Sequence, residues 1–257
     1  MATFGKIGAT PLFKHWSAAD YVRSGLIALW DGTENNGFGN HDPDATLLTN
    51  LVGGNSLTPV KSSYTITPSS IHLVSNGMYA DVPGINDANN SGEWSVQIVA
   101  KNNSTSTSGA QCLFTLAGYG GNSSHKPQLY DANGVNTCGC NAINIGTAAG
   151  WTTLLGIAPL QIRTITLTID SKSSSANTYY ACYRNDILTK SGGRAKSANA
   201  GTYTERISIA CFNPANSSQY WWMRDIEIFS VRVYLKVLSA SDISHNYTVD
   251  KLRFNLT

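Results

Sequence analysis

Charged side chains are scarce in this sequence: they make up 13% of its 257 residues, and the formal net charge is only +2. Lysine and arginine form no continuous run. Binding to nucleic acid requires a concentrated positive surface, so we predict no nucleic-acid partner. Apolar residues make up 42% of the chain, too many for a disordered protein. Together with abundant Ser, Thr, Asn and Gly, this composition favours one large β-sandwich with polar loops.

Long hydrophobic runs are also missing. No stretch is long and apolar enough to cross a membrane, so we predict no membrane insertion. The segment from Met1 to Val22 lacks the continuous apolar stretch of a secretory signal peptide. We therefore expect the protein to be made, and to mature, in a bacterial cytoplasm.

The motifs of several enzyme classes are absent. The five histidines are scattered, and none accompanies the nucleophile-elbow serine of a hydrolase. No glycine-rich loop of the kind that holds phosphate is present either. These absences argue against a serine hydrolase and against a nucleotide-binding enzyme.

Cysteines number five, an odd count that leaves at least one thiol without a partner in the chain. Cys138 and Cys140 are too closely spaced for an easy disulfide, and neither a CxxC pair nor a His-x-x-x-His pattern accompanies them as in a zinc site. We predict reduced, structural thiols rather than zinc ligands. The five are Cys112, Cys138, Cys140, Cys182 and Cys211.

Short segments rich in β-branched and aromatic residues recur along the chain, separated by turn residues. Many short strands with little helix before residue 240 are typical of a two-sheet sandwich. In one of them Trp94, Val96 and Ile98 alternate with polar residues, which predicts one core-facing side. The Asn76-Gly77 pair predicts a tight hairpin between two others. The predicted strands are 25–31, 71–74, 77–82, 93–101, 111–119, 162–170, 177–186, 205–212 and 224–235.

A helix closes the sequence. Ser239, followed three residues later by Asp242, forms a capping-box pattern at a helix start. Ile243, Tyr247 and Phe254 then recur near one helical face. The sequence therefore predicts a short C-terminal helix with one packed side.

Both ends of the chain resemble one protein family. Val231–Phe254 reads VRVYLKVLSASDISHNYTVDKLRF and is similar to the last strand and terminal helix of laminin-G-like domains in the concanavalin A-like lectin/glucanase superfamily. Asp20–Thr58 looks like the opening of a subgroup found in gut-bacterial surface proteins and tailed-phage virion proteins. The resemblance implies an all-β, concanavalin A-like two-sheet sandwich (jelly roll) with a short C-terminal helix. It does not specify function, because the superfamily contains binders, hydrolases and structural modules.

The resemblance suggests two parts, with the sandwich over residues 21–257 and an N-terminal arm over residues 1–20. Phe4, Leu12, Phe13 and Trp16 make this arm apolar for a free tail. Termini stay disordered unless they are tied down. Two alternatives remain open: the arm packs back on its own domain, or it anchors the domain to a partner subunit.

Asp225 and Glu227 are a possible catalytic pair, because two carboxylates two residues apart on a strand share a face. Glucanases of the superfamily use acidic residues at alternating strand positions. Here the leading and trailing acidic positions of that motif are missing, and Arg224 beside Asp225 would favour a low carboxylate pKa. We predict a solvated strand face and no enzymatic activity.

An oxygen-rich loop follows the first predicted strand. Asp31, Glu34, Asp42 and Asp44 offer carboxylates of the kind that calcium prefers, and some laminin-G-like domains hold calcium at a sandwich rim. The spacing is irregular, so a loop of hydrogen-bonded Asx turns is the alternative. No other cofactor is predicted.

Aromatic residues are the predicted sugar-binding groups. Sugar rings stack their C–H faces on aromatic rings, while their hydroxyls pair with Asn, Asp and Gln. Neighbouring residues on a strand face opposite ways, so one of Trp221 and Trp222 is a candidate for exposure. Burial of both is the alternative. The predicted carbohydrate-binding residues are Trp151, Tyr203, Tyr220, Trp221 and Trp222.

The leading hypothesis is a non-enzymatic, lectin-like module on a phage particle. A virion assembles in the host cytoplasm, which agrees with the missing signal peptide and predicts a head-fibre, capsid-decoration or tail-associated protein at the virion surface. Its partners would be glycans and, through residues 1–20, other virion subunits. A homo-oligomer is expected, since multivalency strengthens weak sugar binding. The alternatives are a structural virion protein without sugar binding and a glycoside hydrolase.

Overall fold

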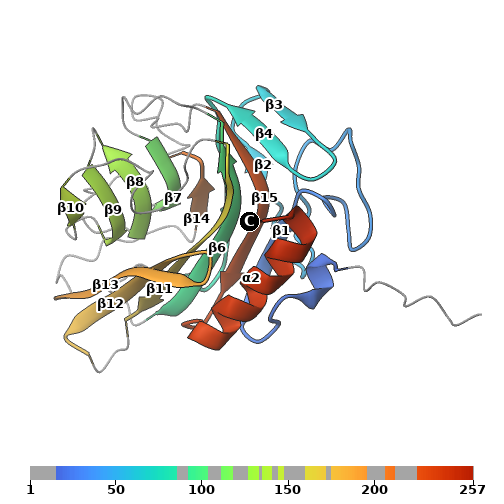
Figure 1. The fold of residues 1–257 in the computed structure, drawn as a ribbon. Coiled ribbons are helices and arrows are strands. Elements are labelled where there is room, and N and C mark those ends of the chain that lie inside the picture. Colours follow the sequence, from blue (N-terminus) through green and yellow to red (C-terminus); the bar gives the residue numbers. More distant parts are fainter. Residues whose placement is uncertain are drawn as a thin grey trace, which may run out of the picture.

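The fold was analysed in a computed structural model, which describes residues 16–85, 92–103, 111–117, 127–132, 135–140, 144–147, 160–171, 175–195, 206–211 and 225–256. Two antiparallel β-sheets pack face to face, and an α-helix follows them at the C-terminus (Figure 1). The predicted all-β two-sheet sandwich is therefore confirmed. No helix in this part of the chain is long and apolar enough to span a bilayer.

In the part of the chain that the structure describes, the larger sheet has eight strands, and β15, the strand before the C-terminal helix, lies near its middle. β1 also pairs with β15 but lies outside the main order of neighbouring strands. The strand order is β13 (Ile187–Ala195), β12 (Asn177–Arg184), β11 (Ile162–Asp170), β6 (Glu93–Asn102), β15 (Asp225–Tyr234), β4 (Ile71–Val74) and β3 (Tyr64–Ile66), with β1 (Leu26–Asp31) off the row.

The second sheet has seven strands among the described ranges, and its central strands supply the opposite wall of the core. Trp94 of the first sheet meets Phe114 of the second with ring centroids 6.0 Å apart. The order is β10 (Asn144–Thr147), β9 (Val135–Cys140), β8 (Pro127–Ala132), β7 (Gln111–Ala117), β14 (Arg206–Ile209), β5 (Met78–Asp81) and β2 (Thr58–Pro59).

The C-terminal helix α2 (Ala240–Phe254) lies on the outer face of the larger sheet, across β11, β6 and β15 (Figure 1). The capping box of Ser239 and Asp242 is present, so the predicted helix start is confirmed. Of the predicted helical face, Ile243 and Phe254 are buried and Tyr247 is partly buried. Because α2 covers this side, both faces of β6 are buried, and Gln97 opposite the core is fully enclosed.

The hairpin predicted at Asn76-Gly77 is wrong. β4 belongs to the larger sheet and β5 to the smaller one, so the chain crosses between the sheets here. The buried Asn76 side chain accepts from Lys61 N (3.0 Å) and donates to Lys61 O (2.9 Å). Gly77 is required for space, since a Cβ there would lie 2.5 Å from Cys211 Sγ. The dipeptide serves a sheet crossing instead of a tight turn.

The cysteine prediction holds in part. Cys112 and Cys211 are free and buried, as expected for structural thiols. Cys182 is disulfide-bonded, so the prediction of reduced thiols is wrong at this position.

Residues 1–15 of the predicted N-terminal arm lie outside the described residues, and its anchoring role stays a prediction. The end of the arm is described. Trp16 packs against a buried cluster beside a short 3-10 helix, η1 (Ala18–Asp20). The cluster contains Ala18, Tyr21, Leu29 and Val249. This part of the arm therefore packs on the sandwich and α2.

Candidate binding pocket

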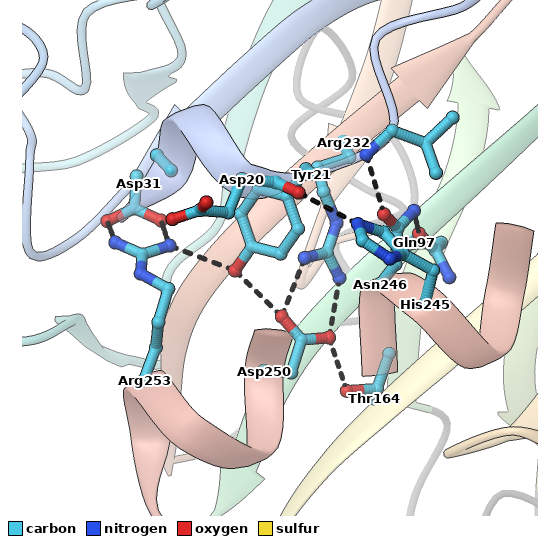
Figure 2. A network of polar contacts seen from close by, with 12 residues as sticks. Asp20, Tyr21, Asp31, Gln97, Thr164, Arg232, His245, Asn246, Asp250 and Arg253 are labelled. Atoms are coloured by element: carbon cyan, nitrogen blue, oxygen red, sulfur yellow. Dashed lines mark hydrogen bonds and ion pairs between the residues drawn. The ribbon is translucent and has the colours of Figure 1, made fainter. Parts of the chain in front are cut away.

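A fully buried ion pair joins α2 to the larger sheet. Arg232 of β15 donates to both carboxylate oxygens of Asp250, at 2.6 and 2.8 Å, and neither side chain has any exposed surface (Figure 2). Burial alone would lower the pKa of Arg232, but the adjacent Asp250 carboxylate outweighs burial and raises that pKa. Arg232 is therefore charged, and its charge is neutralised by Asp250.

Two hydroxyl groups also donate hydrogen bonds to the carboxylate of Asp250. Tyr21 and Thr164 each donate to the carboxylate at 2.7 Å. The ring of Tyr21 also lies 4.0 Å from the guanidinium carbon of Arg232. Burial, followed by the charge of Asp250, raises the pKa of Tyr21 well above its ordinary value. Tyr21 is therefore a phenol that donates a proton to the network.

A second arginine extends this network to the surface. Arg253 donates to Tyr21 Oη at 2.9 Å and to the two oxygens of Asp31 at 2.7 and 2.9 Å. It also donates to Glu34 Oε1 at 3.1 Å. The last turn of α2 thereby fixes the loop that follows β1 (Figure 2).

The loop itself is held by bonds between side chains and backbone. Asp31 accepts from the backbone N–H groups of Thr33 and Glu34, at 3.0 and 3.1 Å. Asn35 exchanges two hydrogen bonds of 2.7 Å with the backbone of Asp42. These are Asx-type contacts, the alternative that the sequence offered for this segment.

The residues predicted to hold calcium are only partly brought together. The carboxylates of Asp31 and Glu34 share Arg253, whose positive charge takes the place that a cation would need. Asp42 instead accepts from Asp44 N at 2.9 Å. Across the described ranges no group of three or more His, Cys, Asp or Glu side chains could hold a metal ion. This geometry does not fit a calcium site at Asp31 and Glu34.

A cavity of about 480 Å³ opens beside Arg253. Its apolar surface comes from Trp16 and from Leu252, which is 55% exposed. The Thr33 hydroxyl and the His41 imidazole have no hydrogen-bond partner among the described residues. Its lining is Trp16, Ser17, Thr33, Glu34, Gly39, His41, Leu252 and Arg253. The pocket thus combines an apolar wall with unused polar groups.

A second polar cluster surrounds Asp225 and Glu227, on the outer face of the larger sheet. His72 Nε2 lies 2.6 Å from Asp225 Oδ1, and Lys101 Nζ lies 3.1 Å from Glu227 Oε1. The Asn103 amide donates to both carboxylates, at 3.2 and 3.0 Å. Each acid therefore has a partner of its own.

The environment of Glu227 is that of an ionised carboxylate. Burial would raise its pKa, but hydrogen bonds from Asn103, Lys101 and Ser70 outweigh burial and lower the pKa below its ordinary value. A general acid in a glycosidase needs a raised pKa. The pKa of Glu227 is thus shifted in the opposite direction. Arg224, the cation considered in the sequence analysis, lies outside the described residues.

The predicted sugar-binding aromatics cannot be placed, because they lie outside the described residues. They are Trp151, Tyr203, Tyr220, Trp221 and Trp222. Arg253 and Leu252 line the pocket although neither was predicted as a site residue from the sequence. The sequence did contain a signal for the buried ion pair beneath the pocket. Arg232 interrupts an apolar strand between Val231 and Val233, and a buried arginine needs an acidic partner.

Comparison with protein families finds no match, and comparison with curated proteins finds none either. Solved structures show the same fold. Trypanosoma rangeli sialidase in complex with sialic acid aligns with a TM-score of 0.63 and 11% identity, over 90% of this chain and 33% of its own. The botulinum neurotoxin serotype D binding domain aligns with a TM-score of 0.59 and 15% identity, over 89% of this chain and 52% of its own. This chain therefore spans about a third to a half of the chains it resembles, and the likeness shows the fold alone.

Proposed function

We propose that this chain is a non-enzymatic carbohydrate-binding module. The observation that carries the proposal is the pocket between the loop after β1 and the end of α2. There the apolar surfaces of Trp16 and Leu252 lie beside the polar groups of Thr33, Glu34 and His41. Small-ligand pockets are mostly apolar with a few placed polar groups, and a sugar ring presents the matching surfaces.

The rigidity of the pocket supports a binding role. Arg253 is held by Tyr21, Asp31 and Glu34, and Tyr21 is held in turn by the buried Asp250. A wall fixed in this way does not have to be ordered when a ligand arrives, which lowers the cost of binding. The similar solved structures include a sialidase in complex with sialic acid and a toxin binding domain, which agrees with a sugar ligand.

Binding without hydrolysis is favoured by the state of the carboxylates. The pKa of Glu227 is lowered, which is the opposite of what a general acid needs, and Asp225 lies 2.6 Å from His72 Nε2. Within the pocket, Glu34 is engaged by Arg253 and by two backbone N–H groups, from Ala18 and Gly39. The fold resembles that of a sialidase. Hydrolysis of a glycan by this chain would therefore contradict this part of the proposal.

The proposed setting is the surface of a tailed-phage particle, as a head-fibre, capsid-decoration or tail-associated protein. This part rests on the resemblance of Asp20–Thr58 and Val231–Phe254 to virion and surface proteins. Display of several copies would multiply a weak single-site affinity. Immunogold electron microscopy of phage particles, with an antibody against this chain, tests the proposed setting. We expect label on intact particles, and label confined to free protein in the lysate would contradict the proposal.

A glycan array with the purified chain tests the central proposal, together with a turnover assay on fluorogenic glycosides. The expected result is binding to a subset of glycans without release of the fluorophore. Release that is lost in Glu227→Gln would instead identify a hydrolase. No binding in either monomeric or clustered form would favour a purely structural role.

A further inference from the structure

We infer that the pocket selects uncharged sugar rings and rejects acidic sugars such as sialic acid. This inference rests on the proposed function and deepens it, because it names the ligand class. It also separates this chain from the sialidase that it resembles in fold, whose solved complex contains sialic acid.

Arg253 supplies the guanidinium among the described residues that line the pocket. A guanidinium has five N–H donors. Four hydrogen bonds already occupy its two terminal nitrogens: one to Tyr21, two to Asp31 and one to Glu34. Recognition of a ligand carboxylate by arginine uses two parallel N–H donors. Asp31 has taken that bidentate position, so Arg253 cannot offer it to a ligand.

The charges around the pocket lead to the same conclusion. Two carboxylates, Asp31 and Glu34, face one guanidinium, which leaves one net negative charge at this wall. The deeper pair of Arg232 and Asp250 is neutral as a unit. An anionic ligand would therefore meet repulsion.

Among the described residues, the nearby cations do not reverse this balance. Arg23 lies over the ring of Phe38, 4.9 Å from its centroid, and does not line the pocket. Lys251 lies 5.8 Å from the ring centroid of Tyr247. His41 is the remaining ionisable group in the lining.

The same groups suit a neutral sugar. Among the described residues, Glu34 Oε2 accepts a hydrogen bond only from Gly39 N, at 3.0 Å, so with respect to them it retains a lone pair for a ligand hydroxyl. Hydrogen bonds to an ionised acceptor are the stronger kind. Thr33 and His41 can add neutral bonds, and Leu252 offers apolar contact at the rim. The volume of about 480 Å³ accommodates a small ligand of this class.

Saturation-transfer NMR with the full chain tests the inference. The probes are the methyl glycosides of glucose, galactose, mannose and N-acetylglucosamine, with N-acetylneuraminic acid as the acidic probe. Leu252→Ala and Thr33→Val remove pocket contacts. Leu188→Ala is the matched control, because Leu188 is also half exposed (50% against 55%) but lies on β13.

The expected result is saturation transfer to at least one neutral glycoside and none to N-acetylneuraminic acid. Leu252→Ala should weaken the Kd about tenfold, as for a lost apolar contact in a pocket. Thr33→Val should weaken it about threefold through a lost hydroxyl. Leu188→Ala should leave the Kd unchanged.

The possible failures are distinguishable. Binding of N-acetylneuraminic acid that is weakened by Leu252→Ala would overturn the charge argument. Neutral binding unaffected by both pocket variants would place the site elsewhere, so this inference would fail while the proposed function stands. If neither these probes nor a glycan array shows binding, the proposed function fails, and the inference fails with it.

Discussion

The buried pair of Arg232 and Asp250 gives the sharpest stability prediction. Four donors converge on the Asp250 carboxylate: two from Arg232 and one each from Tyr21 and Thr164. Asp250→Asn keeps the shape of the side chain but replaces one acceptor oxygen by an N–H donor that would point at these groups. It also leaves the guanidinium of Arg232, which is 0% exposed, without a counter-charge.

Loss of one partner of a buried ion pair costs about 3–5 kcal/mol. For a chain of this length, 1 kcal/mol shifts the Tm by roughly 2–4 °C, so the Tm should fall by roughly 6–20 °C. Urea denaturation followed by tryptophan fluorescence, with thermal melts by circular dichroism, measures both quantities.

Two variants control the experiment. Asp81→Asn breaks the exposed pair with Arg206, whose side chains are 53% and 33% exposed, and should cost less than about 1 kcal/mol. The double variant Arg232→Met/Asp250→Leu removes both buried charges and should be clearly more stable than Asp250→Asn. If Asp250→Asn lowers the free energy of unfolding no more than Asp81→Asn does, the stabilising role assigned to the buried ion pair is refuted.

Three further predictions concern the helix cap, the thiols and acid stability. Ser239→Ala removes the side chain that accepts from Asp242 N and should destabilise the protein by about 1 kcal/mol in urea denaturation; no change would show that the cap is unimportant. Burial raises the pKa of Cys211 to about 12 and that of Cys112 well above its ordinary value. Both thiols should therefore resist iodoacetamide in the native protein and react in guanidinium chloride, as peptide mass spectrometry would show; native labelling would contradict their burial. The pKa of Glu227 lies below its ordinary value of 4.5, so its stabilising contribution is present above that pH and is lost as the pH falls through the folded-state pKa. Glu227→Gln should flatten the fall in Tm between about pH 5 and pH 3. An unchanged dependence of Tm on pH would contradict the lowered pKa of Glu227.

Local patterns in the sequence were sufficient for the helix and for most of the longer strands, but the predicted strands do not include β2, β3, β8, β9 or β10. Ile226 and Ile228 lie at alternate positions of β15 and are both buried, and Ser239 and Asp242 lie close enough in sequence to show the cap. The Asn76-Gly77 dipeptide was misleading, because the same residues fit a hairpin or a sheet crossing. The choice depends on whether the flanking strands pair, which is not a local property.

The pocket could not be predicted from local patterns. Arg253 reaches Asp31 across 222 residues of sequence, and Tyr21 reaches Asp250 across 229. The loop after β1 therefore looked like a cluster of free oxygen ligands, although α2 brings a guanidinium to it. Only the docking of the terminal helix reveals which carboxylates are already paired.

A crystal structure of the chain with its strongest array glycan tests the central claim most directly. We expect an intact, uncharged sugar ring in the pocket, against Leu252 and within hydrogen-bond distance of Glu34 Oε2. A cleaved glycan lying across Asp225 and Glu227, or a pocket left empty while the glycan binds elsewhere, would contradict it.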